Sequence, residues 1–318
     1  MNLDRRQFLG AAGGALLASL LPAPARSDAR GRAAGPKVGM CDWNLGRSAN
    51  PDDIPKAAAA GLDGVLVSVG TAPDDMPLRD PAVREKYLEL GERYGISYPS
   101  VAAGQILNEI PLKSEPQSAV YVIDAVEAAK ALGGHDILVA FFSDGDLRLK
   151  DAEGNLRNTS NGPYKEYALD ERGVQRVVEA LRQIAPRAED AGIVLGLENT
   201  LTARQNLDIL ERVASPMVQV YYDVGNSTAY GYDVPTELRL LGNDRICEIH
   251  IKETLGMDDP QWGLLGGPTT GGVDWQGTGQ AVHDIGYDKW FILETSGREG
   301  RFEEDTRANV AFVKQRFG

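Results

Sequence analysis

From residue 37 to the C-terminus, short β-rich runs alternate with helical segments, and this unit occurs eight times. Helical segments such as 116–133 and 170–192 begin at Pro or Asp and end at Gly, as helix termini commonly do. Eight alternating units over about 280 residues predict a (β/α)8 barrel. The β-rich runs are residues 37–43, 63–69, 96–102, 135–142, 193–198, 218–224, 245–251 and 290–295.

A doubly wound open sheet is the alternative fold for such alternation. Its first strand-to-helix turn usually carries the pattern G-x-G-x-x-G. The residues after the first β-rich run read NLGRSAN and do not have it. A chain of 318 residues, 42% of them hydrophobic, can bury one large core. We therefore predict a single barrel domain over residues 37–318.

The first 25 residues differ in composition from the rest of the chain. They contain Arg5 and Arg6, a weakly apolar run at 8–21, and Ala-Pro-Ala at 23–25. This arrangement resembles a twin-arginine export signal that is cleaved after Ala25. The apolar run is short for a membrane span. We expect a flexible linker at 26–36, export in the folded state to the periplasm or another extracytoplasmic place, and no stable membrane anchor.

Charge and cysteine content limit the functional classes. The formal net charge is −13, and an acidic surface repels phosphate backbones, which argues against a nucleic-acid partner. Cys41 and Cys247 could pair in an oxidising compartment. However, Cys247 and His250 are three residues apart, so strand alternation directs Cys247 toward the outer helices. Both cysteines are therefore expected to be buried free thiols.

The stretch EIHIKE, residues 248–253, places polar side chains on one face of a predicted strand. Strands of parallel sheets are usually hydrophobic throughout, so this polar face needs an explanation. Inward-facing residues near the C-terminal end of barrel strands line the mouth, where active sites of this fold lie. We therefore expect His250 at the mouth, Glu248 deeper in the barrel and Lys252 just above the rim.

The neighbouring strands carry acids at the equivalent position, namely Glu198, Asp223 and Glu294. One acid at a strand end is more often a helix cap or an ion-pair partner. Three carboxylates held together repel one another unless a cation neutralises them. Three oxygens and the imidazole of His250 suit one divalent ion, with Mn²⁺ as first choice and Mg²⁺, Co²⁺ or Zn²⁺ as alternatives.

Several motifs carry a resemblance to a known family: GLEN, YYDVGN, EIHIKE, GGVDW and GYDKWFILE. They resemble the xylose-isomerase-like TIM barrel superfamily of sugar phosphate isomerases and epimerases, in the same order along residues 37–318. The resemblance implies that Glu198, Asp223, His250 and Glu294 bind one divalent metal. It also implies that Glu198 and Glu294, on opposite sides of the substrate, are catalytic and exchange protons with it.

The same residues indicate a reaction on a small sugar or keto-sugar. A metal chelated by a carbonyl and a neighbouring hydroxyl acidifies the adjacent C–H bond and holds the resulting enediolate. One glutamate removes the proton, and the other returns it to the opposite face or to the next carbon. Isomerisation or epimerisation is therefore the first choice. If the next carbon carries a leaving group, the chain is instead a lyase or hydratase, for instance on 3-keto-glycosides.

Two other functional classes fit less well. A non-catalytic sugar-binding barrel would not need both glutamates. Endonuclease IV shares the superfamily, but that enzyme type needs several metals, more histidines and a basic groove. This chain has three histidines and a net negative charge.

Four further residues are predicted to contact substrate. Trp43 can stack on a sugar ring or close the barrel mouth, and Lys252 follows the metal histidine by two residues. Asn226 can bind a hydroxyl group, in a position where some ketose epimerases of the superfamily have histidine. Arg298 either binds an anion or balances the acidic rim. The long connection 143–169 is predicted to contain a small hairpin and to act as a lid or a contact in a homo-oligomer.

Overall fold

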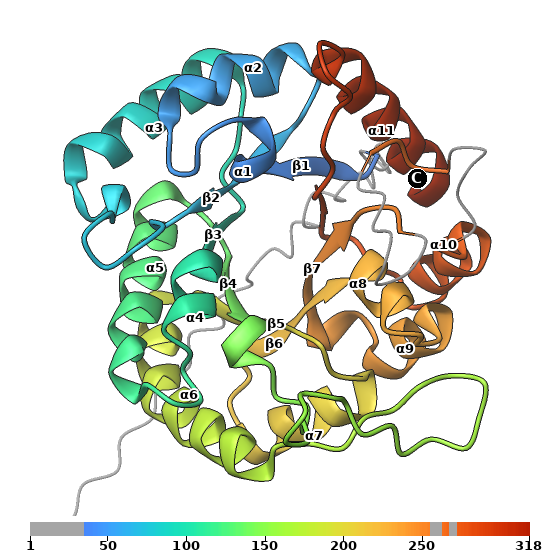
Figure 1. Ribbon diagram of the computed structural model, residues 1–318. Coiled ribbons are helices and arrows are strands. Elements are labelled where there is room, and N and C mark those ends of the chain that lie inside the picture. Colours follow the sequence, from blue (N-terminus) through green and yellow to red (C-terminus); the bar gives the residue numbers. More distant parts are fainter. Residues whose placement is uncertain (1–34, 255–262, 267–271) are drawn as a thin grey trace, which may run out of the picture. The chain divides into compact units, whose positions relative to one another are not determined.

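The computed structural model describes residues 35–254, 263–266 and 272–318, and it confirms the predicted (β/α)8 barrel (Figure 1). All eight strands are parallel, and β1 pairs with β8 to close the sheet. The predicted signal segment and nearly all of the predicted linker lie outside the described residues. The strands are β1 Lys37–Cys41, β2 Gly64–Ser68, β3 Ser100–Ala102, β4 Asp136–Phe141, β5 Val194–Asn199, β6 Val218–Asp223, β7 Ile246–Ile251 and β8 Trp290–Leu293.

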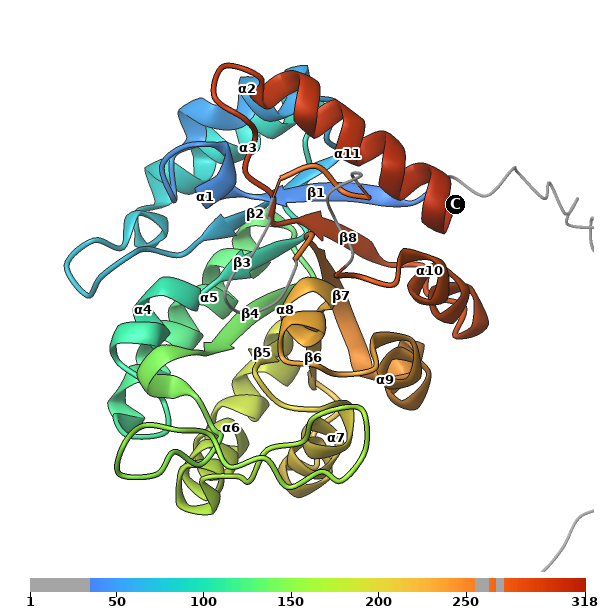
Figure 2. The same ribbon diagram turned by 45° about the vertical axis from the view of Figure 1, so that its right-hand side comes forward.

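Helices surround the strands as an outer ring (Figures 1 and 2). The segment predicted at 170–192 is helix α6, where the Asp170 side chain accepts from the backbone N–H of Gly173 and Gly192 ends the helix at a φ of 71°. Within the described residues, no helix has the length and apolarity needed to cross a membrane. The helices are α1 Asp42–Leu45, α2 Ile54–Ala59, α3 Pro81–Tyr94, α4 Gly104–Glu109, α5 Ala119–Leu132, α6 Glu171–Ala191, α7 Ala203–Val213, α8 Val224–Ala229, α9 Val234–Leu241, α10 Trp275–Asp284 and α11 Phe302–Phe317.

The lower end of the barrel interior is filled by large side chains that lie against glycines. A Cβ atom on Gly64 would lie 2.8 Å from the Trp290 ring, and one on Gly39 would lie 2.7 Å from Ile292. The glycines therefore provide the space that the indole and the isoleucine occupy. Trp290 and Ile292 belong to a buried hydrophobic cluster in the barrel interior.

Strand β7 contains one more residue than the matching stretch of β6. Val220 pairs with Ile246, but the next residue, Tyr221, pairs with Glu248, so Cys247 is the extra residue of a β-bulge. Cys247 packs into the barrel interior, where its sulfur occupies the space beside Gly196. The prediction that Cys247 faces the outer helices was therefore wrong, because alternation does not hold across a bulge. The prediction that both cysteines are buried and free is confirmed.

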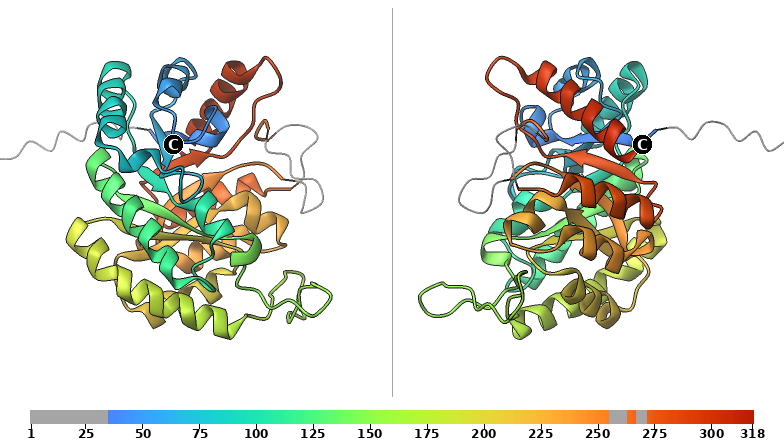
Figure 3. Two further views of the ribbon diagram at one scale, coloured as in Figure 1. Left: turned by 60° about the vertical axis from the view of Figure 1, so that its left-hand side comes forward. Right: turned by 90° about the vertical axis from the view of Figure 1, so that its right-hand side faces the viewer.

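The long connection 143–169 contains the predicted hairpin and extends away from the barrel (Figure 3). Lys150 forms an antiparallel bridge with Leu156 across the turn. At its base, the guanidinium group of Arg148 binds the Asp146 carboxylate and lies over the rings of Tyr167 and Tyr230. These buried contacts attach the connection to the mouth side of the barrel.

Candidate active site

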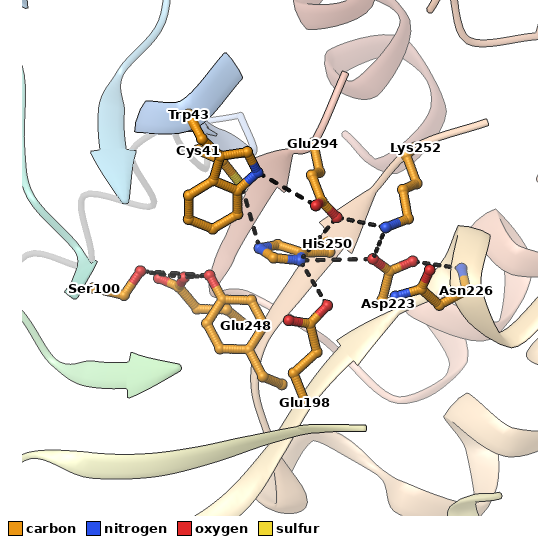
Figure 4. A network of polar contacts seen from close by, with 11 residues as sticks. Cys41, Trp43, Ser100, Glu198, Asp223, Asn226, Glu248, His250, Lys252 and Glu294 are labelled. Atoms are coloured by element: carbon orange, nitrogen blue, oxygen red, sulfur yellow. Dashed lines mark hydrogen bonds and ion pairs between the residues drawn. The ribbon is translucent and has the colours of Figure 1, made fainter. Parts of the chain in front are cut away.

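Four polar side chains converge at the C-terminal ends of neighbouring strands (Figure 4). Nδ1 of His250 on β7 lies 3.1 Å from Oε1 of Glu198 on β5 and 3.6 Å from Oδ2 of Asp223 on β6. Oε2 of Glu294, the residue that follows β8, is also 3.6 Å from this nitrogen. One ligand atom from each residue lies within 4.8 Å of the other three. The structure thus brings together the four residues that the sequence pattern selected.

This donor set fits a divalent cation. Three carboxylates face one imidazole nitrogen in a place that is almost closed to solvent. Without a cation, burial raises the pKa of Glu198, and the neighbouring Glu294 and Asp223 carboxylates raise it further against the effect of His250. A divalent ion together with the ammonium group of the nearby Lys252 would neutralise the three carboxylates.

That ammonium group belongs to Lys252, which is 3% exposed. Its Nζ lies 2.9 Å from Asp223 Oδ2 and 2.5 Å from Glu294 Oε2. Burial alone would raise the pKa of Asp223, but Lys252 and His250 hold it below its usual range. Lys252 therefore links two of the converging carboxylates and does not lie free above the rim.

A layer of side chains below the four residues fixes the position of His250. Sγ of Cys41 lies 3.5 Å from Nε2 of His250, and the Tyr221 ring meets the imidazole edge-on at 4.6 Å. Glu248 accepts hydrogen bonds from the Tyr221 hydroxyl and, at 2.7 Å, from Ser100 on the opposite strand β3. Burial raises the pKa of Glu248 to about 7. Glu248 does lie deeper than His250, as predicted. The roles of Cys41, Tyr221 and Ser100 were not predicted, because they follow only from three-dimensional contacts.

The second carboxylate oxygen of Glu294, beside the one that Lys252 binds, accepts a hydrogen bond from the indole of Trp43. Nε1 of Trp43 donates to Oε1 of Glu294 at 3.3 Å, while Lys252 holds Oε2. Trp43 thus does more than cover the mouth, since it orients a carboxylate of the site. Its position directly after β1, in helix α1, explains this reach across to the neighbouring strand β8.

A cavity of about 260 Å³ opens above these groups, a volume slightly below the usual range for ligand pockets. Of the predicted substrate contacts, Trp43, Asn226 and Lys252 line it. Gln105, Asn108 and Tyr230 also line it and were not predicted, because they lie beyond the strand ends to which the sequence pattern pointed. The complete lining is Trp43, Gly104, Gln105, Asn108, Leu138, Ala140, Phe142, Glu198, Asn226, Tyr230, Lys252 and Glu294.

Arg298 does not belong to this lining. Its guanidinium group binds the buried carboxylate of Asp305 at 2.5 Å, at the start of helix α11. The geometry therefore gives no support to the prediction that Arg298 contacts substrate. The charge-balancing alternative agrees with this ion pair.

The family model of xylose isomerase-like TIM barrels matches residues 54–316. The chain belongs to this family. It is 28% identical over 241 residues to the 2-epi-5-epi-valiolone 7-phosphate 2-epimerase of Actinoplanes sp., an alignment that covers 74% of this chain and 79% of the relative. The chain is accordingly a sugar isomerase/epimerase-like enzyme.

Solved structures share the fold at lower sequence identity. D-psicose 3-epimerase from Clostridium cellulolyticum H10, solved with D-tagatose, has a TM-score of 0.68 and 18% identity. The 3-keto-D-glucoside 4-epimerase of E. coli has a TM-score of 0.67 and 13% identity. Each comparison covers 88% of this chain and 99% of the other chain. They show the same barrel over nearly its whole length.

Proposed function

We propose that the protein is a divalent-metal-dependent sugar isomerase or epimerase that moves a proton on a carbon next to a carbonyl group. The observation that carries the proposal is the convergence of Glu198, Asp223, His250 and Glu294 within 4.8 Å, at the edge of a cavity of about 260 Å³. These four residues would hold the ion, with Mn²⁺ as first choice. Such an ion, when bound, polarises the carbonyl and acidifies the adjacent C–H bond.

Glu198 and Glu294 are the proposed proton carriers. Both line the cavity, and they lie at the ends of different strands, Glu198 within β5 and Glu294 directly after β8, so a sugar between them can meet two separate carboxylates. One carboxylate takes the proton and leaves an enediolate, and the other returns a proton. Return to the opposite face of the same carbon epimerises the sugar, and return to the next carbon isomerises it. Trp43 and Lys252 hold the Glu294 carboxylate in place for this transfer.

The other polar groups of the cavity are proposed to bind the sugar. Asn226 follows Asp223 in helix α8, and its backbone N–H donates to Asp223 Oδ1 at 2.7 Å, which ties the position of one residue to the other. The Asn226 side chain and the Lys252 ammonium group face the same cavity as the two glutamates. Each can donate a hydrogen bond to a sugar oxygen.

The first test is the metal content of the purified mature protein, measured by elemental mass spectrometry. About one equivalent of a divalent metal is expected in the wild type, and Asp223→Ala should lose it. Asp190→Ala removes an exposed acid and serves as the matched control. If the wild type neither contains nor takes up a divalent ion, the proposal fails.

The second test follows solvent deuterium. An isomerase or epimerase should incorporate deuterium from D₂O into a ketose or keto-glycoside without breaking it. A lyase or hydratase would release a leaving group and form an unsaturated ketone from the same enediolate. A binding barrel would do neither, and Glu294→Gln would then leave ligand affinity nearly unchanged.

We further propose that the protein works outside the cytoplasm, on the basis of Arg5, Arg6 and the small residues up to Ala25. Replacing both arginines by lysine should keep the protein in the cytoplasmic fraction. Periplasmic protein that begins after Ala25 in the wild type would support the proposal, and equal export of the two forms would contradict it.

A further inference from the structure

The short helix α1 carries Trp43, whose indole donates to one carboxylate oxygen of Glu294 (Figure 4). This helix has four residues, and the side chain of Cys41 at its start makes no capping hydrogen bond. A single helical turn is not stable alone, because fixing its backbone dihedrals costs more free energy than its few hydrogen bonds contribute. The direction of the indole therefore depends on contacts that hold α1 against the barrel.

The first residue of the helix, Asp42, supplies three such contacts and is 4% exposed. Its Oδ2 accepts hydrogen bonds from the backbone N–H groups of Ala49 and Ser68, both at 2.7 Å. Its Oδ1 accepts a third from the Ser68 hydroxyl group, also at 2.7 Å. Ser68 is the last residue of β2, which pairs with β1. The carboxylate thus attaches α1 to the strand on one side of β1.

Ala49 has an unusual backbone conformation. Its φ of 53° lies in the left-handed region that residues other than glycine rarely adopt. Such a conformation persists where surrounding contacts hold it, and the hydrogen bond from the Ala49 N–H to Asp42 is one of them. Asp42 therefore holds both ends of residues 42–49, which we call the α1 segment. Between these ends, the exposed Lys56 donates to the carbonyl oxygen of Leu45.

The α1 segment also contacts the chain after β8, on the other side of β1. Trp43 Nε1 donates to Glu294 Oε1 at 3.3 Å, and Asn44 Nδ2 donates to Ser296 Oγ at 3.4 Å. β8 is the second neighbour of β1 in the closed sheet. Consecutive side chains of a helix point about 100° apart. Fixing Asp42 on the β2 side therefore sets the direction in which Trp43 leaves the helix.

Asp42 itself is not part of the cavity lining. Within the described part of the chain it forms no ion pair, and all three of its hydrogen-bond donors are neutral. Burial raises the pKa of Asp42 to about 6, while the donors on Ala49 and Ser68 lower it. The carboxylate is thus ionised at neutral pH, and it acts there as the acceptor for three hydrogen bonds.

We propose that Asp42 is a positioning residue, which holds the α1 segment so that Trp43 keeps the Glu294 carboxylate in place. The inference rests on the proposed function and adds to it a residue whose hydrogen-bond partners include none of the four converging side chains. Glu294 is both a proposed metal ligand and a proposed proton carrier. Loosening Trp43 should therefore weaken metal binding as well as proton transfer.

The first test follows the indole N–H of Trp43 by NMR in the metal-free mature protein. The chain has four tryptophans, and the resonance of Trp43 is the one missing from Trp43→Phe. In Asp42→Ala this resonance should shift, and its proton should exchange with D₂O about 3- to 10-fold faster, as expected for loss of one hydrogen bond. The other three indole resonances should stay unchanged. An unchanged Trp43 resonance in folded Asp42→Ala would overturn the inference.

A conservative variant tests the three hydrogen bonds. The amide oxygen of Asp42→Asn can accept both backbone N–H groups, and its N–H can donate to the Ser68 hydroxyl oxygen, so the Trp43 resonance should stay close to that of the wild type. A resonance that is perturbed as strongly as in Asp42→Ala would contradict a role through these bonds. If Asp42→Ala does not fold, Ser68→Ala removes one of the donors and should still shift the Trp43 resonance. An unchanged resonance there would overturn the inference.

A matched buried acid separates positioning from a general loss of stability. Glu237 in α9 also accepts hydrogen bonds from one backbone N–H group and one hydroxyl group. Glu237→Ala should therefore destabilise the protein without changing the Trp43 resonance. An equal response of Trp43 to Glu237→Ala and Asp42→Ala would show that it reports only general loosening, and the inference would fail.

The second test measures the affinity for Mn²⁺ alone, from the electron paramagnetic resonance signal of the free ion. Asp42→Ala and Trp43→Phe should each weaken Mn²⁺ binding about tenfold, within the range for groups that orient a metal ligand. The double variant should be at most about twofold weaker than the weaker single variant, because both changes release the same carboxylate. Effects that multiply in the double variant would show that Asp42 does not act through Trp43.

These outcomes are separable from failure of the proposed function, because the indole measurement needs neither metal nor substrate. A Trp43 resonance that depends on Asp42, in a protein that takes up no Mn²⁺, would support the positioning of Trp43 and remove the proposed function. Loss of a bound metal in Asp223→Ala, together with an unchanged Trp43 resonance in Asp42→Ala, would do the reverse.

Discussion

The two ends of the barrel interior use the same strands for opposite purposes. At the floor, Trp290 and Ile292 of β8 fill space left by Gly64 and Gly39, and this layer stabilises the barrel by burial and close packing. Glu294 follows Ile292 by two residues and therefore also points inward. At the mouth it belongs to a group of three carboxylates and an imidazole. At the mouth these carboxylates repel one another, although Lys252 pairs with two of them. The floor thus provides the stability that holds a repulsive but chemically useful layer in position.

The largest effect should come from a change at the mouth that preserves shape. Glu294→Gln should lower the rate of deuterium exchange about 1000-fold, because a proton carrier is lost while size and hydrogen bonding remain similar. The free energy of unfolding of the metal-free protein should change by less than about 1 kcal/mol, since one of three crowded carboxylates is removed. Exchange kinetics and denaturant unfolding in the presence of chelator measure both. Retained exchange activity would remove Glu294 from the mechanism.

Glu237 is a buried acid outside the barrel interior, and it allows a structural acid to be compared with the acids of the proposed active site. Glu237 in α9 accepts hydrogen bonds from the Ala203 backbone N–H and the Tyr222 hydroxyl, and burial raises its pKa from 4.5 to about 7. Because the folded-state pKa is raised, the neutral form favours folding, and this contribution is lost as pH rises from about 4.5 through 7.

Glu237→Gln should therefore gain stability relative to the wild type as pH rises from 5 to 8, by up to about 3 kcal/mol. Urea unfolding at several pH values measures the difference, with the exposed Glu211→Gln as control. Parallel stability curves for the wild type and Glu237→Gln would show that the acid is ionised throughout this range. The rate of deuterium exchange should not respond to the change.

The floor should respond in the opposite way to the mouth. A methyl group at Gly64 would also lie 2.9 Å from the Ser97 carbonyl oxygen, so Gly64→Ala should lower the free energy of unfolding by about 2 kcal/mol. The exchange rate per folded molecule should stay unchanged. Gly162→Ala, where nothing lies within 4 Å of the added carbon, is the control. A loss of exchange activity without a loss of stability would contradict the separation of the two layers.

The smallest effect is expected at Arg298. Its side chain is 49% exposed and pairs with Asp305 outside the cavity lining, so Arg298→Ala should lower stability only slightly. The KM for the substrate should change less than about twofold, because no contact with substrate is lost. A large rise in KM with unchanged stability would instead support Arg298 as a substrate contact.

Strand alternation predicted the fold and the positions of Glu198, Asp223, His250 and Glu294, because a closed barrel brings the C-terminal ends of neighbouring strands together by geometry alone. The same reasoning did not extend to Asn108 and Gln105. Their placement depends on the path of the chain after β3, and alternation contains no information about loops and short helices.

The surroundings of two other residues, Arg298 and Cys247, could not be predicted from the sequence pattern. Arg298 was selected by its charge and its distance in sequence from Glu294, but its direction is set by Asp305, a partner seven residues away on α11. Cys247 was assigned by counting from His250, and a single unpaired residue in the ladder reversed the answer. The wrong orientation of Cys247 does not affect the four converging residues, because all of them lie above the bulge or on other strands.

The bulge at Cys247 also bears on how such a barrel can change over evolutionary time. An inserted or deleted residue in a regular strand turns every side chain beyond it to the other face. Such a change within β5 would direct Glu198 toward the helices and end activity. In β7 the ladder already accommodates one residue that has no partner on β6, and Glu248 and His250 still point inward. Loss of residue 247 would therefore restore regular pairing with β6 and keep His250 on the inward face.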